Sequence, residues 1–141
     1  MINRPHFVLD SFALLAFFRA ETGGDRVREL LEQAQAGEIA LSITTVNVGE
    51  VFYRAIRERG LEDAHEMLGR VKEFGVEIAS VDLELALMAG SLKAVSGIGY
   101  ADCFVAALSQ RLNAVIVTGD PDFRQIEHLV PVEWLRSGDA Q

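Results

Sequence analysis

Apolar residues follow two different spacings along this chain. Short, dense apolar runs predict β-strands, and apolar residues that recur every three to four positions predict helices. The expected strands cover residues 6–9, 39–43, 76–81, 114–117 and, at an edge of the sheet, 130–134. The expected helices cover residues 11–20, 25–36, 45–59 (beginning at Thr44 or Thr45), 61–74, 83–95 and 100–112. This alternation predicts an α/β fold with three layers, α/β/α, around a mainly parallel central sheet.

Three local features refine this prediction. The helix 100–112 is apolar on nearly all sides, so it should be buried on most faces. The strand 114–117 is rich in β-branched residues and should lie inside the sheet. Gly49 falls inside the helix 45–59, where glycine costs about 1 kcal/mol relative to alanine. We therefore expect a close approach of backbone or ligand at Gly49.

The composition suits one compact domain over residues 1–141. Half of the 141 residues are hydrophobic and 24% are charged, which allows a substantial core. No stretch is long and apolar enough to span a bilayer, and the apolar run 12–18 is a poor signal peptide. The single cysteine, Cys103, excludes an internal disulfide and should be a buried small residue. We expect a cytoplasmic protein that has no membrane partner.

The net charge of −8 argues against a nucleic-acid partner when taken alone. Bound metal would compensate several of the acidic residues. Arg54, Arg57 and Arg59 also form a local basic cluster, although such a cluster equally suits a solvated helix face.

Two acidic residues come directly after predicted strands. Asp10 follows the strand 6–9, and Asp120 follows the strand 114–117. In parallel sheets the carboxyl ends of strands share one edge, where ligands bind. Asp10 could simply cap the next helix, but a buried carboxylate is costly unless it is paired or binds metal. Asp120 could belong to an ordinary turn.

Two further acidic residues lie on predicted helices. Glu50 lies opposite the apolar face of its helix, together with Asn47, and could be an exposed residue paired with Arg54. Asp102 is the only acidic residue on the apolar helix 100–112, where it could also serve the helix dipole. Carboxylates are the ligands that Mg²⁺ and Mn²⁺ prefer. Convergence of all four would therefore indicate metal-assisted phosphodiester chemistry.

The remaining polar residues near these positions have auxiliary or alternative roles. Asp122 is a further candidate ligand through water, or the cap of a short helix around residue 125. Ser11 and Thr118 are candidates for positioning a water molecule or a phosphate oxygen. Phe123 is expected in the core, and the three histidines show no metal-ligand spacing.

The ordered set of motifs resembles the PIN-domain nucleases. The matching segments are Val-Leu-Asp-Ser at 8–11, Asn-Val-Gly-Glu at 47–50, Tyr-Ala-Asp-Cys-Phe-Val-Ala-Ala at 100–107 and Val-Thr-Gly-Asp-Pro-Asp-Phe at 117–123. The length of the chain makes it most similar to the VapC-type toxins of toxin–antitoxin pairs. The resemblance implies a PIN fold, dependence on Mg²⁺ or Mn²⁺, endoribonuclease activity, homodimerisation and a small antitoxin partner. It implies catalytic and metal-binding roles for Asp10, Glu50, Asp102 and Asp120.

The same acidic residues are also compatible with other functions. The alternatives are a PIN-like RNA-processing nuclease outside a toxin–antitoxin system and a non-catalytic acidic module that binds basic partners. A phosphatase of the haloacid-dehalogenase type would carry an aspartate where Phe12 stands, and a receiver domain would carry a late strand-end lysine. The sequence therefore favours a metal-dependent ribonuclease that hydrolyses RNA phosphodiester bonds.

Overall fold

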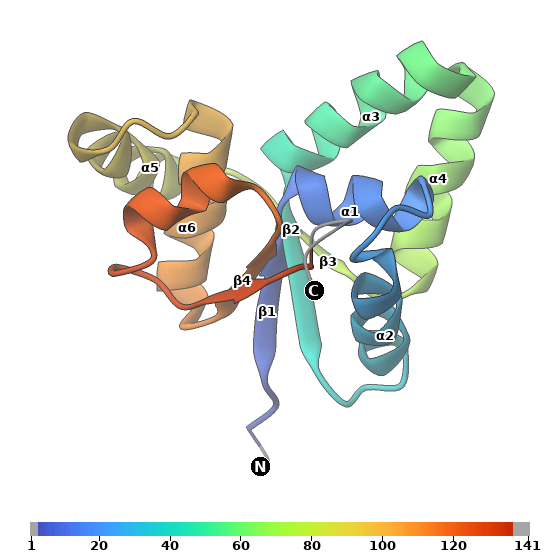
Figure 1. The fold of residues 1–141 in the computed structure, drawn as a ribbon, viewed down its shortest axis with the longest axis horizontal. Helices are drawn as coiled ribbons and strands as arrows, with labels where there is room; N and C mark the ends of the chain where they lie inside the picture. Colours follow the sequence, from blue (N-terminus) through green and yellow to red (C-terminus); the bar gives the residue numbers. More distant parts are fainter. Residues whose placement is uncertain (1–2, 137–141) are drawn as a thin grey trace.

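A computed structural model describes residues 3–136 (Figure 1). The strands are β1 (His6–Leu9), β2 (Ala40–Thr44), β3 (Glu77–Ala79), β4 (Val115–Thr118) and β5 (Val132–Trp134). The helices are α1 (Ser11–Phe18), α2 (Gly24–Gln35), α3 (Thr45–Arg59), α4 (Leu61–Glu73), α5 (Leu83–Val95), α6 (Tyr100–Leu112) and the 3₁₀ helix η1 (Pro121–Ile126).

The five strands form one parallel sheet in the order β3-β2-β1-β4-β5. Because β1 lies at the centre, it pairs with β4, which is more than a hundred residues away along the chain. Leu9 is the register partner of Val117, so the residues that follow these two strands lie beside each other. The carboxyl edge of the sheet thereby brings together two segments that are far apart in the sequence.

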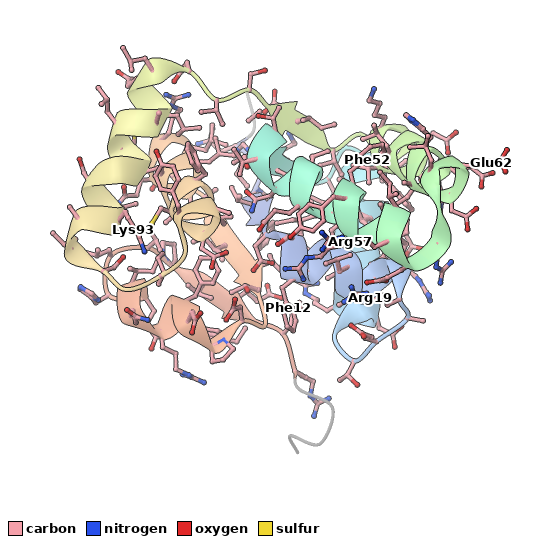
Figure 2. The ribbon with its side chains drawn as sticks, turned by 90° about the horizontal axis from the view of Figure 1, so that it is seen from above. Phe12, Arg19, Phe52, Arg57, Glu62 and Lys93 are labelled. Carbon is pink, nitrogen blue, oxygen red and sulfur yellow. The ribbon has the colours of Figure 1, made fainter. Side chains whose placement is uncertain are left out.

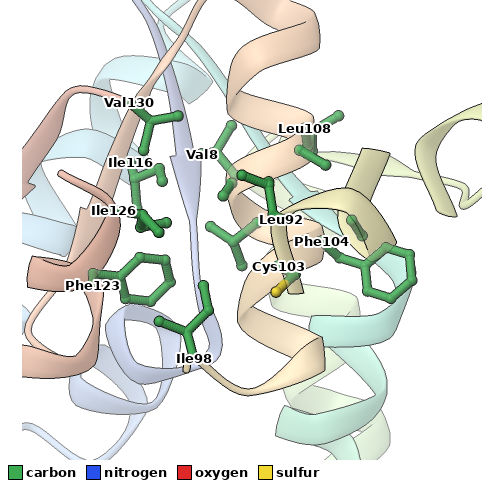
Figure 3. Close-up of a cluster of buried hydrophobic side chains, with 14 of the residues drawn as sticks. Val8, Leu92, Ile98, Cys103, Phe104, Leu108, Ile116, Phe123, Ile126 and Val130 are labelled. Atoms are coloured by element: carbon green, nitrogen blue, oxygen red, sulfur yellow. The ribbon is translucent and has the colours of Figure 1, made fainter. Parts of the chain in front are cut away.

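Helices cover both faces of this sheet. Helices α1 to α4 lie on one side, and α5, α6 and η1 lie on the other (Figure 1). Alternation along the strands supplies both cores: Val8 and Ile116 face α6 (Figure 3), whereas Leu9 and Val117 face α1 and α2. The predicted α/β/α fold with a parallel sheet is confirmed.

Several element ends differ from the predictions. Helix α1 ends at Phe18 rather than residue 20, because Ala20 has a positive φ of 54° that is incompatible with a right-handed helix. Strand β3 covers three residues instead of six, and β5 begins after Pro131, at residue 132. The turn after Gly119 contains the expected short helix, η1.

The expectations for buried elements are confirmed. Cys103 and Phe123 have no exposed surface, and β4 lies inside the sheet. In the part of the chain that the structure describes, no single helix has the length and apolar character needed to cross a bilayer; α5 and α6 meet that test only as a pair bent by 119°.

Candidate active site

Asp10 is buried at the junction between β1 and α1. Its side chain is 1% exposed. One carboxylate oxygen, Oδ1, accepts a 2.8 Å hydrogen bond from the backbone N–H of Ala13, so Asp10 does cap α1. The other, Oδ2, accepts a hydrogen bond from the hydroxyl of Thr118, at the end of the neighbouring strand β4. Capping and a place in the site are therefore two uses of one side chain.

Thr118 also connects Asp10 to the loop that carries Asp120. Its Oγ1 accepts a 2.9 Å hydrogen bond from the backbone N–H of Asp120. The Asp120 carboxylate in turn accepts a 2.9 Å hydrogen bond from the backbone N–H of Asp122 and so caps η1. Thr118 is fully buried, and its hydroxyl group holds both Asp10 and the Asp120 loop in place through these two hydrogen bonds.

Glu50 is held by a buried asparagine that the sequence analysis placed on the outer face of its helix. Asn47 has no exposed surface, and its side-chain amide donates a 3.2 Å hydrogen bond to Glu50. Asn47 is itself fixed by the hydroxyl of Thr44, which caps α3. The available signal was a capping threonine followed three residues later by a polar side chain. No ion pair between Glu50 and Arg54 is present among residues 3–136.

Asp102 lies in the first turn of α6, on the opposite side of the sheet from Glu50. The helix begins after Gly99, which offers no side-chain cap. Asp102 is half-buried, and no hydrogen bond to its carboxylate is present within residues 3–136. The other three carboxylates each accept at least one hydrogen bond.

The four carboxylates line one cleft of about 170 Å³ at the carboxyl edge of the sheet. Ser11 lines the same cleft, whereas Asp122 is exposed and lies outside it. The other lining residues are Phe12, Leu15, Arg19, Glu21 and Arg54. Figure 2 looks onto this edge and shows Phe12 between the two helical layers, with Arg19 and Arg57 on the side of α1 and α3.

Burial and crowding shift the protonation of two of these carboxylates. Burial raises the pKa of Asp10 to about 7, helped by the charges of Asp102 and Asp120 and opposed by the hydrogen bonds from Thr118 and Ala13. The pKa of Asp102 is raised to about 6, first by burial and then by the nearby charges of Asp120, Glu50 and Asp122, while Arg54 lowers it. Shifts of this kind are concentrated at functional sites, although structural ion networks also produce them.

The donor chemistry of the cleft fits a hard divalent cation, because four carboxylates from four segments face it. As the side chains stand, no three Asp, Glu, His or Cys residues within the described range 3–136 are grouped closely enough to hold a metal ion. Without a cation, the like charges of Asp120, Glu50 and Asp122 disfavour ionisation of Asp102 and add to the larger effect of burial on its pKa. Coordination would require these side chains to rotate toward one another.

The sequence profile of the PIN domain matches residues 7–129. The chain belongs to the PIN domain family. This match spans β1 to η1 and includes all four carboxylates of the cleft. Among curated proteins, none matches this sequence.

Solved structures with similar folds include VapC-type PIN proteins. The Rickettsia felis VapBC2 structure, bound to a promoter DNA fragment, has a TM-score of 0.74 at 18% identity over 93% of this chain and 99% of that chain. The DNA-bound VapBC of Salmonella typhimurium has a TM-score of 0.70 at 18% identity, covering 92% and 97% of the two chains. Mycobacterium tuberculosis VapC20, a sarcin–ricin loop cleaving toxin, has a TM-score of 0.66 at 14% identity, covering 84% and 92%. At these identities the likeness establishes the PIN fold.

Proposed function

We propose that this PIN protein is a metal-dependent endoribonuclease and the toxin of a toxin–antitoxin pair. The observation that carries the proposal is the convergence of Asp10, Glu50, Asp102 and Asp120, from four separate segments, on one cleft of a PIN domain. The structural likeness to VapC20, a sarcin–ricin loop cleaving toxin, supports RNA as the substrate.

The four carboxylates would hold one or two Mg²⁺ or Mn²⁺ ions, with Asp122 as a further ligand through water. When bound, the cation supplies Lewis-acid activation of water and stabilises charge at the scissile phosphate. Thr118 fixes Asp10, and Asn47 fixes Glu50, so these two hydrogen bonds orient two of the four carboxylates. Ser11, which lines the same cleft, would orient a water molecule or a phosphate oxygen.

Cleavage of RNA by the purified chain tests the activity. RNA should be cleaved with Mn²⁺ and left intact with chelator. Asp10→Asn or Asp102→Asn should lower the rate at least ~100-fold, equivalent to about 2.7 kcal/mol of transition-state stabilisation. Asp25→Asn is the matched control, since Asp25 is almost fully exposed on α2. This variant should cleave RNA at the wild-type rate. Wild-type rates for either site variant at saturating Mn²⁺ would contradict the site.

The toxin role has a test of its own. Expression of the wild-type chain should arrest growth, and Asp102→Asn should not. A processing nuclease outside a toxin–antitoxin system would instead cleave its RNA without arresting growth. The expected homodimer is measured by light scattering of the purified chain.

A cognate antitoxin should place a basic side chain in the acidic cleft. Arg54 already lines this cleft and lowers the pKa of Asp102, so a guanidinium suits the local charge. Arginine can also pair with carboxylates through two hydrogen bonds. A structure of the complex with the four carboxylates open to solvent and fully metallated would contradict this mode of inhibition.

A further inference from the structure

Phe12 is an exposed aromatic side chain in the wall of the carboxylate cleft. The four residues that follow it on α1 are buried, but Phe12 itself is 43% exposed. It lines the same cleft as Asp10, Asp102 and Asp120 (Figure 2). Holding a cation requires no aromatic ring there, and leaving one in water forgoes the free energy of burying it.

The ring is seated against the backbone of Gly119. A Cβ atom added at residue 119 would lie 2.4 Å from Cε1 of Phe12 and 2.8 Å from its Cζ. Gly119 is not among the glycines with positive φ, so backbone conformation does not require a glycine there. Contact with the ring does. One edge of Phe12 is therefore supported by the loop that carries Asp120, while much of the remaining ring surface faces solvent.

We propose that Phe12 is a substrate-positioning residue that stacks on a nucleobase next to the scissile phosphate. This inference rests on the proposed ribonuclease function. Proteins recognise single-stranded RNA largely by stacking unpaired bases on aromatic rings. Stacking does not depend on charge, which matters in a chain of net charge −8 whose cleft has more acidic than basic lining residues. A ring fixed beside the carboxylates would set which phosphate reaches them.

Tyr53 on α3 provides a matched control. Its exposed fraction is also 43%, but it does not line the cleft. Its ring is already engaged by two guanidinium groups, those of Arg57 at 5.1 Å and Arg54 at 6.0 Å. Replacing Tyr53 by leucine therefore removes an equally exposed aromatic ring that does not itself line the cleft.

The first test measures stacking and cleavage on a single-stranded RNA that carries 2-aminopurine, whose fluorescence falls when it stacks. Phe12→Leu should weaken RNA binding about 5- to 150-fold, the range associated with loss of one base–aromatic stack, and should abolish quenching. It should raise KM more than it lowers kcat. Phe12→Trp should retain binding and quenching, and Tyr53→Leu should behave as wild type.

The second test uses the contact between Phe12 and Gly119. Gly119→Ala should displace the ring and weaken RNA binding to a similar extent, yet cause no further loss in a Phe12→Ala background. Equal losses in both backgrounds would show that Gly119 acts through the Asp120 loop and would overturn the proposed seat. Melting temperatures of all variants verify that each one is folded.

The outcomes separate this inference from the proposed function. If wild type neither binds nor cleaves RNA, the ribonuclease proposal fails. If wild type cleaves RNA while Phe12→Leu keeps its KM and its quenching, only the stacking role is overturned. If Phe12→Leu cleaves RNA like wild type but is inhibited less by a cognate antitoxin, the ring binds a protein partner. That outcome also overturns the stacking role.

Discussion

At the residue scale, the candidate site includes a carboxylate that also holds the fold together. Asp10 caps α1 with one oxygen and accepts a hydrogen bond from Thr118 with the other. Each carboxylate oxygen has two lone pairs, so these bonds leave acceptor capacity facing the cleft. The cost of this arrangement appears in the raised pKa of Asp10, which burial causes.

Removing the buried charge should therefore stabilise the metal-free protein. Asp10→Asn keeps an oxygen for the Ala13 N–H and loses the charge that burial disfavours. Its melting temperature in chelator at pH 7.5 should exceed that of wild type, although activity is lost. Asp25→Asn should leave the melting temperature nearly unchanged, because Asp25 is exposed. A lower melting temperature for Asp10→Asn would show that the ionised carboxylate is structural.

Asn47 is the clearest residue that sequence reasoning misplaced. Asn47→Ala should destabilise the fold by about 1–3 kcal/mol, since it breaks a buried hydrogen-bond chain that begins at Thr44. It should also weaken Mn²⁺ binding, because Glu50 loses the bond that orients it. Chemical denaturation and metal titration measure the two effects separately. As a control, Asn113→Ala replaces an exposed asparagine at the end of α6, where Mn²⁺ affinity should not change.

At the element scale, the helices and strands were predictable because each leaves a periodic signal in the sequence. The ends of α5 and α6 agree with prediction. The lengths of β3 and β5 were not predictable, because the number of paired residues depends on neighbouring strands that the sequence does not reveal. The burial of Asn47 was not predictable either, because helical spacing does not show how deeply a polar residue is buried between the layers.

Of the two approaches expected at Gly49, by backbone or by a ligand, the backbone approach is wrong. A Cβ added there meets no atom within 4 Å, and Gly49 is exposed on α3. Gly49→Ala should therefore stabilise the protein by up to about 1 kcal/mol through helix propensity. Gly24→Ala provides the contrast, because its Cβ would lie 2.7 Å from the carbonyl oxygen of Ala16 and should destabilise the fold. Thermal unfolding of both variants checks the two signs.

At the scale of the whole molecule, strand order explains why the sequence could suggest the site but not assemble it. Asp10 and Asp120 were expected at one edge of a parallel sheet, and the β1–β4 pairing places them there. Glu50 and Asp102 come from helices on opposite faces, so their approach depends on how α3 and α6 pack at that edge. Only the resemblance to PIN domains predicted from the sequence that Glu50 and Asp102 would share a site with Asp10 and Asp120.

The crowded carboxylates link folding, protons and metal. Burial raises the pKa of Asp10 from 3.8 to about 7. Below pH 3.8, Asp10 is protonated in both the folded and the unfolded protein, so its burial does not lower the stability of the fold. As pH rises toward about 7 the unfolded chain releases its proton more readily than the native one, so stability falls. Asp102, whose pKa is raised to about 6, contributes in the same direction. The metal-free protein should therefore lose stability between about pH 4 and pH 7.

Metal should reverse this loss, because a cation binds the folded site in its ionised form. At a hundredfold excess over its Kd, Mn²⁺ should stabilise the native state by about 2.7 kcal/mol, or several degrees in Tm. At pH 5, protons compete for Asp10 and Asp102, so the shift in Tm should be smaller than at pH 7.5. Asp102→Asn should reduce the shift at both pH values and lessen its dependence on pH. Equal shifts at the two pH values for the wild-type protein would mean that Mn²⁺ binds elsewhere than at these carboxylates.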